Sequence, residues 1–353
     1  RRELVKWFNH ENPRLKKGLA ISPVKFGISF TLTHLNQAGA LVHIYSDGSI
    51  HLNHGGTEMG QGLFTKVAQV AASAFGLPLS SIKITATDTA KVPNTSATAA
   101  SSGSDLNGMA VKVACETIKQ RLIYFAAKHF DTPTDLIKFG TGIIQIGEQQ
   151  ISFAKLASLA YQNRISLSST GFYATPKIEW DRKAGKGRPF FYFAYGASVT
   201  EVVIDTLTGE NRILRTDIIH DVGKSLNPAI DIGQIEGGYV QGAGWLTTEE
   251  LVWDNKGVLK TQAPSTYKIP ACSDCPDIFN VTLWNKGENT EDTIYKSKAV
   301  GEPPFMLGIS AFLALSDAVA ATGDKSIYPD LQAPATAEQI LKAVNCQKGL
   351  KWD

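Results

Sequence analysis

Three short segments rich in small residues each stand directly before a predicted helix. They span residues 55–62, 95–105 and 299–304. The first N–H groups of a helix have no partner inside the helix, and together with the helix dipole they attract anions. Glycine allows close backbone approach, and Ser and Thr hydroxyls add donors. We therefore expect the three segments to form a cradle for a large anionic cofactor, although one such segment alone is more often an ordinary strand-to-helix turn.

The first of these segments does not fit the common nucleotide-binding motifs. No Lys-Ser or Lys-Thr pair follows its glycines, and their order is not Gly-x-Gly-x-x-Gly. A phosphate-binding loop and a dinucleotide fold both require those patterns. The expected cofactor is therefore not an ordinary nucleotide.

Glu302 is the acidic residue whose position in the sequence most favours a catalytic role. It precedes Pro303-Pro304, which predicts an extended backbone for Glu302 at the start of a helix. A carboxylate at that place is stabilised by the helix dipole and suits a general base. The alternative is a charge that only stabilises the helix end, and the local sequence leaves both open.

Aromatic and histidine side chains suggest a second set of candidates. Phe26 and Phe30 are four residues apart, which usually indicates core packing, but such rings also stack on flat substrates. His43 and His51 are expected to face each other across a hairpin. No third ligand can be identified, so the sequence predicts no metal site there.

The four cysteines predict reduced thiols. Cys272 and Cys275 form a Cys-x-x-Cys pair in a loop, but no second pair and no nearby histidine completes a metal site. We therefore expect a reducing compartment, the cytoplasm.

Predicted strands and helices alternate unevenly along the chain, which indicates a mixed α/β or α+β fold. These elements must position the candidate residues. Asp47-Gly48 predicts the turn of a hairpin over 38–54, and Gly76 predicts the end of a helix that starts at Leu63. The other expected elements are strands at 82–86, 190–204, 211–220, 258–260 and 278–284, helices at 108–127, 231–247 and 304–321, and capped helices after Ser152 and Thr336.

The predicted helix 231–247 is unusual in its glycine content. It contains Gly233, Gly237, Gly238, Gly242 and Gly244. Each costs about 1 kcal/mol relative to alanine in a helix interior. We expect close approach of a neighbouring backbone or a ligand to be the reason.

Length and composition limit the function classes. The chain has 353 residues, 35 basic and 33 acidic side chains and a net charge of +2, which argues against a broad basic surface for nucleic acids. No apolar run is expected to reach the roughly 18 residues of a membrane helix. The length favours two domains, which we place at 1–165 and 166–353. The first residue is Arg1, so we expect a processed chain or a piece of a longer one.

Four longer motifs resemble the molybdenum-binding half of the xanthine dehydrogenase family. They are HGGTEMGQG (54–62), TAASSGSD (98–105), LNPAIDIGQIEGG (226–238) and KAVGEPPFMLG (298–308), and they stand in the order of the family. Aldehyde oxidases share the glycine-rich segments but differ around residues 25–38. Here the segment 25–39, KFGISFTLTHLNQAG, is similar to the xanthine type.

The resemblance implies a molybdopterin cofactor whose molybdenum carries hydroxyl, oxo and sulfido ligands and is held through the pterin, not by protein side chains. Glu302 would deprotonate the hydroxyl, whose oxygen attacks the purine carbon while hydride passes to the sulfido ligand. Phe30 would stack on the purine, Thr31 would bond near it, and His34, where animal relatives tend to have Phe, would shape the pocket mouth. The implied cofactor-binding residues are Gly60, Gln61, Thr98, Ala100, Ser101, Ser102, Gly103, Ser104, Gln234 and Gly301.

The implied function is oxidative hydroxylation of hypoxanthine to xanthine and of xanthine to urate, with water as the oxygen source. The resemblance also implies partners: FAD and [2Fe-2S] clusters in another chain or domain, the N-terminal half of the molybdenum domain, and a higher oligomer. Neither nucleic acid nor a membrane is expected as a partner. Two alternatives stay open: a molybdenum hydroxylase for aldehydes or other N-heterocycles, and an assembly module without its own catalysis.

Overall fold

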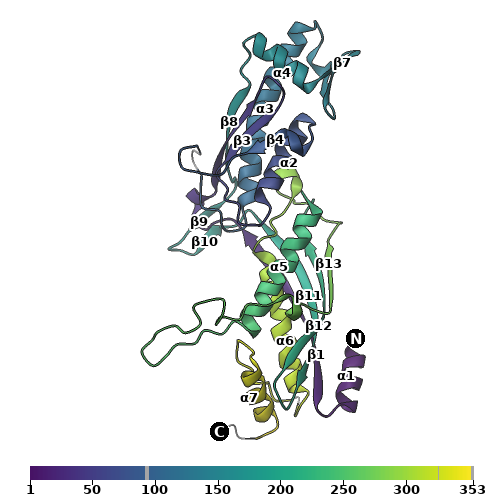
Figure 1. The fold of residues 1–353 in the computed structure, drawn as a ribbon, viewed down its shortest axis with the longest axis vertical. Helices are drawn as coiled ribbons and strands as arrows, with labels where there is room; N and C mark the ends of the chain where they lie inside the picture. Colours follow the sequence, from purple (N-terminus) through teal and green to yellow (C-terminus); the bar gives the residue numbers. More distant parts are fainter. Residues whose placement is uncertain (92–94, 325, 351–353) are drawn as a thin grey trace.

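Two four-stranded sheets lie one beyond the other along the long axis of the molecule (Figure 1). The computed structural model describes residues 1–91, 95–324 and 326–350. Helices α1 and α7, the first and last helices of the described chain, both lie at the end occupied by the second sheet. The chain passes between the two units several times.

The first sheet contains the predicted hairpin. Its strand order is β4-β3-β2-β8, and the antiparallel β2–β3 pair places His43 opposite His51, as expected. Helices α2 and α3 pack on one face. The elements are β2 (Gln37–Ile44), β3 (Ile50–His54), α2 (Leu63–Phe75), β4 (Ile82–Ile84), α3 (Gly103–His129) and β8 (Ser168–Ala174).

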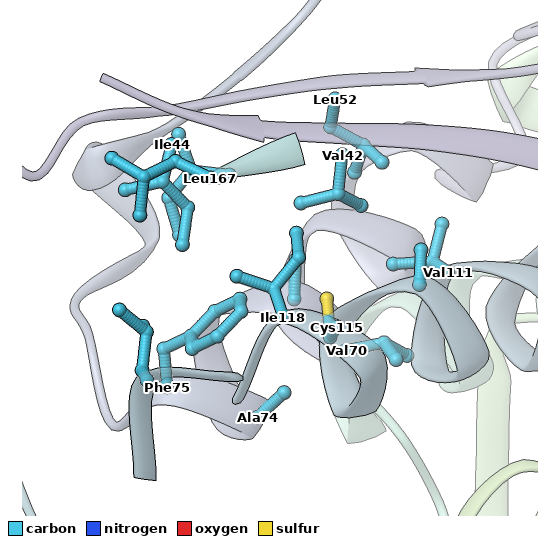
Figure 2. Close-up of a cluster of buried hydrophobic side chains, with 14 of the residues drawn as sticks. Val42, Ile44, Leu52, Val70, Ala74, Phe75, Val111, Cys115, Ile118 and Leu167 are labelled. Atoms are coloured by element: carbon cyan, nitrogen blue, oxygen red, sulfur yellow. The ribbon is translucent and has the colours of Figure 1, made fainter. Parts of the chain in front are cut away.

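Alternating apolar residues on these strands make the core of the first unit. Val42, Ile44 and Leu52 point from the sheet toward Val70 and Ile118 of the helices (Figure 2). Each of these side chains is at most 1% exposed. Helix α2 ends at Gly76, whose backbone is left-handed with φ 68°, as its glycine predicted.

A small three-stranded sheet and helix α4 extend this unit. The Ser152 hydroxyl accepts a hydrogen bond from the Lys155 N–H at 3.1 Å, which confirms the predicted helix cap. The elements are β5 (Ile137–Phe139), β6 (Ile143–Ile146), β7 (Gln149–Ser152) and α4 (Phe153–Gln162).

The second sheet has the order β1-β11-β12-β13 and carries α5 and α6. Asn227 caps α5 through its side chain, and Thr336 caps α7 in the same way, as predicted for Thr336. The elements of this unit are α1 (Arg2–Glu11), β1 (Leu15–Ile28), β11 (Tyr192–Asp205), β12 (Asn211–Asp221), α5 (Pro228–Thr247), β13 (Ile278–Leu283), α6 (Ile309–Ala320) and α7 (Ala337–Gln347). Strands β9 (Glu179–Asp181) and β10 (Lys186–Arg188) pair with each other in a separate two-stranded sheet.

Several local expectations were wrong. Helix α3 begins at Gly103 and not at residue 108, so the end of the expected loop, residues 103–105, is the first turn of the helix. The expected strand at 258–260 is absent, since Leu259 forms only an isolated bridge with Trp253. Strands β1 and β8 were not predicted. In β8, a Cβ on Gly171 would lie 2.0 Å from the Ala110 carbonyl oxygen, so the strand lacks an apolar side chain where α3 crosses it.

The two sheets interleave along the sequence. Strand β1 comes first in the chain but pairs with β11 of the second unit, and β8 lies beyond residue 165 but pairs with β2 of the first. The division at residue 165 stays a prediction.

The expected helix 304–321 is two elements. A 3-10 helix, η6 (Pro303–Gly308), leads into α6. Together they form an 18-residue helical stretch, Pro303–Ala320, with a mean hydropathy of 1.4, which is longer than the apolar runs we expected. Of this stretch 61% is buried within the protein, and α6 packs against β1 and β11. It is placed as a core helix of the second sheet.

Helix α5 and η6 approach each other at backbone distance. A Cβ on Gly242 would lie 2.0 Å from the Phe305 carbonyl oxygen, and a Cβ on Gly308 would lie 2.4 Å from the Ala243 nitrogen. A Cβ on Gly238 would lie 3.0 Å from Pro304 Cβ. Close backbone approach therefore explains these glycines, as expected for the helix. Gly233 and Gly237, in contrast, have open space beside them.

We expect Gly242→Ala to lower the thermal stability of the full-length protein. The added methyl group must displace the backbone of η6, at a cost of about 1–3 kcal/mol. The matched control is Gly237→Ala, where the methyl group meets nothing within 4 Å. This control should stabilise by up to about 1 kcal/mol through helix propensity. The melting temperatures of the two variants measure these effects. Equal changes in melting temperature would contradict the close contact between α5 and η6.

Candidate functional site

A pocket of about 270 Å³ lies where the three small-residue segments meet. We refer to them as the first loop (55–62), the second loop (95–102, leading into α3) and the third loop (299–302). The structure brings eight of the predicted site residues together in its lining: Gln61, Thr98, Ser101, Gly103, Ser104, Gln234, Gly301 and Glu302. The lining also includes Met59, Lys66, Asp231 and Lys298, which the sequence did not suggest.

Hydrogen bonds join the three loops directly. The Thr57 N–H donates to the Thr98 hydroxyl at 2.9 Å, which links the first loop to the second. The Glu302 N–H donates to the Ser101 hydroxyl at 2.7 Å, which links the third loop to the second. The second loop therefore lies between the other two loops. Its Thr98 and Ser101 hydroxyls accept hydrogen bonds from the backbone N–H groups of those loops.

In the first loop, Glu58 occupies the N–H groups that we expected to be free. Its carboxylate accepts from the N–H groups of Gly60, Gly62 and Phe64 at 2.8–3.0 Å. Burial would raise the pKa of Glu58, but these backbone donors outweigh it and the pKa is lowered. In this structure Glu58, a residue of the loop itself, therefore occupies the helix start, and anion binding by the first loop stays a prediction. Gln61 is still presented to the pocket, whereas Gly60 is outside its lining.

The second loop keeps its donors open. No side chain of the described residues caps the start of α3. Ala100 and Ser101 are both left-handed, with φ 53°, which for non-glycine residues costs about 1–2 kcal/mol each. Such strain is concentrated at functional sites. This loop and the first turn of α3 fit an anionic group better than the first loop does. Ala100 and Ser102 are outside the lining.

The third loop presents Glu302 at the pocket rim. Its backbone is helical, with φ −84° and ψ −36°, and not extended as the following proline predicted. The bond to Ser101 and the turn from the Phe305 N–H to the Glu302 carbonyl, at 3.0 Å, hold this conformation. The side chain is exposed, and no described residue donates a hydrogen bond to its carboxylate. The Glu302 carboxylate is therefore accessible from the pocket.

Helices α2 and α5 close the floor of the pocket with a buried ion pair. Lys66 and Asp231 bond to each other, with side chains 8% and 3% exposed. Asp231 lies one turn before Gln234, so both face the pocket from α5. The sequence did contain a signal for Lys66, which is the single charged residue of the largely apolar helix α2.

The candidate substrate residues lie outside this lining. Phe30, Thr31 and His34 belong to the segment after β1, which the buried Asn36 holds together. The Phe30 N–H donates to Asn36 Oδ1 at 2.8 Å, and Asn36 Nδ2 donates to the Phe30 carbonyl at 2.9 Å. Phe30 is half-buried, and Thr31 and His34 are exposed.

No cluster of three or more His, Cys, Asp or Glu side chains suited to a metal ion occurs among the described residues. All four cysteines are free thiols, including Cys272 and Cys275.

Residues 1–276 match the molybdopterin cofactor-binding domain family. The chain is 49% identical over 342 residues to the xanthine dehydrogenase of Dictyostelium discoideum, covering 95% of this chain and 24% of that protein. It is 50% identical over 346 residues to the xanthine dehydrogenase/oxidase of Mus musculus, covering 96% of this chain and 24% of that protein. The chain thus spans about a quarter of the length of these relatives.

Solved structures share the fold at lower identity. The chain aligns with quinoline 2-oxidoreductase from Pseudomonas putida 86 with a TM-score of 0.83 at 23% identity, covering 98% of this chain and 44% of that one. The copper- and molybdenum-containing CO dehydrogenase gives 0.81 at 22% identity, covering 99% and 44%. The mixed α+β fold class expected from the sequence is confirmed.

We expect Glu58→Gln to remove one acid-sensitive component of stability. Because folding lowers the pKa of Glu58 below its usual 4.5, its contribution is present above that pH and is lost as the pH falls through the lowered value. The variant should be less stable than the parent near pH 7, and the difference should shrink toward pH 3. Melting temperatures across this range measure it, and a difference independent of pH would contradict the role of the charge.

Proposed function

We propose a function for this chain from the premise that it belongs to the molybdopterin cofactor-binding domain family. The chain is the part of a larger xanthine dehydrogenase that holds the pterin end of the molybdenum cofactor and supplies the catalytic carboxylate. The reaction is hydroxylation of hypoxanthine to xanthine and of xanthine to urate. The observation that carries this is the pocket itself, in which Glu302 faces a cradle made by the second loop and α5.

The residues present fit such a cofactor. The pocket offers polar groups from Gln61, Ser104 and Gln234 to a pterin with many ring nitrogens. The uncapped start of α3 offers backbone N–H groups to a phosphate. Gly301 allows close approach on the side of Ser101, since a Cβ there would lie 3.2 Å from the Ser101 hydroxyl oxygen.

When bound, the molybdenum cofactor supplies the two-electron oxidation and the incorporation of oxygen from water. Glu302 acts as the general base of this reaction. Its carboxylate has no hydrogen-bond donor within the described chain, and the backbone around it is held on both sides, so the group is positioned while its oxygens stay available to a ligand. Phe30 and Thr31 hold the purine ring by stacking and hydrogen bonding, and His34 shapes the entrance.

The purine assignment follows the relatives named xanthine dehydrogenase, which are about 50% identical to this chain. Because the chain spans 24% of their length, we propose that FAD, the iron–sulfur clusters and the first half of the molybdenum domain lie in other segments or chains. We further propose a higher oligomer in the cytoplasm. Turnover of xanthine, hypoxanthine and an aromatic aldehyde by the complete enzyme separates this function from an aldehyde-type hydroxylase.

We expect Glu302→Ala in the complete enzyme to lower kcat for xanthine by about 10²–10⁴-fold, the range for loss of a general base. Molybdenum and pterin content should stay unchanged. The matched control is Glu338→Ala, an acidic residue in the first turn of α7, which should keep normal turnover. Normal xanthine hydroxylation by the Glu302 variant would refute the assignment.

We expect Phe30→Ala to raise the Michaelis constant for xanthine about 2–13-fold, as the loss of an aromatic contact of about 0.5–1.5 kcal/mol predicts. Phe172→Ala is the control, because Phe172 is an exposed ring on β8. Steady-state kinetics with xanthine measure both. An unchanged constant for the Phe30 variant would count against stacking.

A further inference from the structure

A buried hydrogen-bond chain connects the start of α3 to the start of the third loop. The Ala299 N–H donates to the Tyr192 hydroxyl at 2.8 Å, and the Tyr192 hydroxyl donates to Asp105 Oδ2 at 2.6 Å. The three residues come from α3, β11 and the loop that carries Glu302. All three are buried, with Tyr192 5% and Asp105 7% exposed.

The direction of this chain is set by chemistry. A backbone N–H can only donate, so the Tyr192 oxygen must accept from Ala299. The tyrosine has one proton, which must therefore go to Asp105. Only a residue with an acceptor oxygen at position 105 completes the arrangement.

The same turn of α3 also holds the other end of the third loop. Ser101, two residues before Gly103, accepts from the Glu302 N–H, and Asp105 lies in the first turn of the helix. The four residues 299–302 are thus attached to one helix start at both ends. A loop fixed at both ends presents its side chain in a narrow range of positions, which base catalysis requires.

We propose that Asp105 and Tyr192 are positioning residues that fix the Glu302 loop for catalysis. This inference rests on the proposed role of Glu302 as the base. Neither residue lines the pocket, so neither contacts the substrate or the cofactor there. They act through the Ala299 backbone.

The environment of Asp105 supports a role beyond packing. Burial raises its pKa to about 7, although the bond from Tyr192 and the charge of Lys66 oppose the rise. A buried carboxyl weakens folding relative to a well-packed apolar side chain. Its place beside the site is explained if its oxygen is needed to orient Tyr192.

The test compares Tyr192→Phe with the parent in the complete enzyme by amide hydrogen exchange, followed in peptides that cover residues 297–302. Loss of the hydroxyl leaves the Ala299 N–H without its acceptor, and we expect exchange there to rise about tenfold, the factor for one lost hydrogen bond. The kcat for xanthine should fall, with KM and molybdenum content unchanged.

Tyr239→Phe is the matched control. Its hydroxyl is also buried and bonds to Thr200 and Thr216, away from the third loop. We expect this change to leave exchange at 297–302 unaltered. At position 105, Asp105→Asn keeps an acceptor oxygen and should retain protection, whereas Asp105→Leu should lose it.

Unchanged exchange in Tyr192→Phe, or an equal rise in Tyr239→Phe, would overturn the positioning role. If Asp105→Leu does not fold, the comparison of Tyr192→Phe with Tyr239→Phe still decides. The exchange measurement does not need turnover. A parent enzyme that fails to hydroxylate purines would therefore remove the proposed function while exchange still reports whether the loop is held.

Discussion

The contact between the backbones of α5 and η6 is the constraint on which the site depends. Gly242 and Gly308 leave no side chain between these elements, so the 3-10 turn lies directly on the helix. Glu302 immediately precedes that turn, and Gln234 lies two helical turns before Gly242. The two sides of the pocket are thus joined through this contact, and a methyl group there would change the distance between them.

Polar contacts join the two sheets at the site, beside an apolar contact in which Ile294 enters the core of the first unit. Each sheet has its own hydrophobic cluster, with the first unit's core largely separate from those of the second. Between them lie the Lys66–Asp231 pair, the Asp105–Tyr192–Ala299 chain and the Ser101–Glu302 bond. Buried polar groups need partners with defined geometry, which makes such a junction specific in position. A pocket at the junction of two units, with a few polar groups converging on it, is a usual place for a cofactor.

Local patterns predicted much of the secondary structure. Asp47-Gly48 gives the hairpin turn, Gly76 the left-handed end of α2, and Ser152 and Thr336 the helix caps, because each of these depends on a few neighbouring residues. Strand β1 escaped prediction since its pairing partner, β11, lies about half the chain away. Strand β8 was not predicted for a different reason. Gly171 stands where the strand faces α3, so the strand lacks an apolar side chain at that contact.

The sequence by itself determined which segments form the site, through small residues placed before helices and a carboxylate placed before two prolines. Only the tertiary structure decided how each segment is used. Glu58 fills the helix start that its own loop creates, and the second loop keeps its donors open. Glu302 adopts a helical backbone against the preference of a residue before proline, because Ser101 from another unit binds its N–H. Hydrogen bonds between residues distant in the sequence outweigh local backbone preferences of a few kcal/mol. A local sequence pattern does not predict such hydrogen bonds.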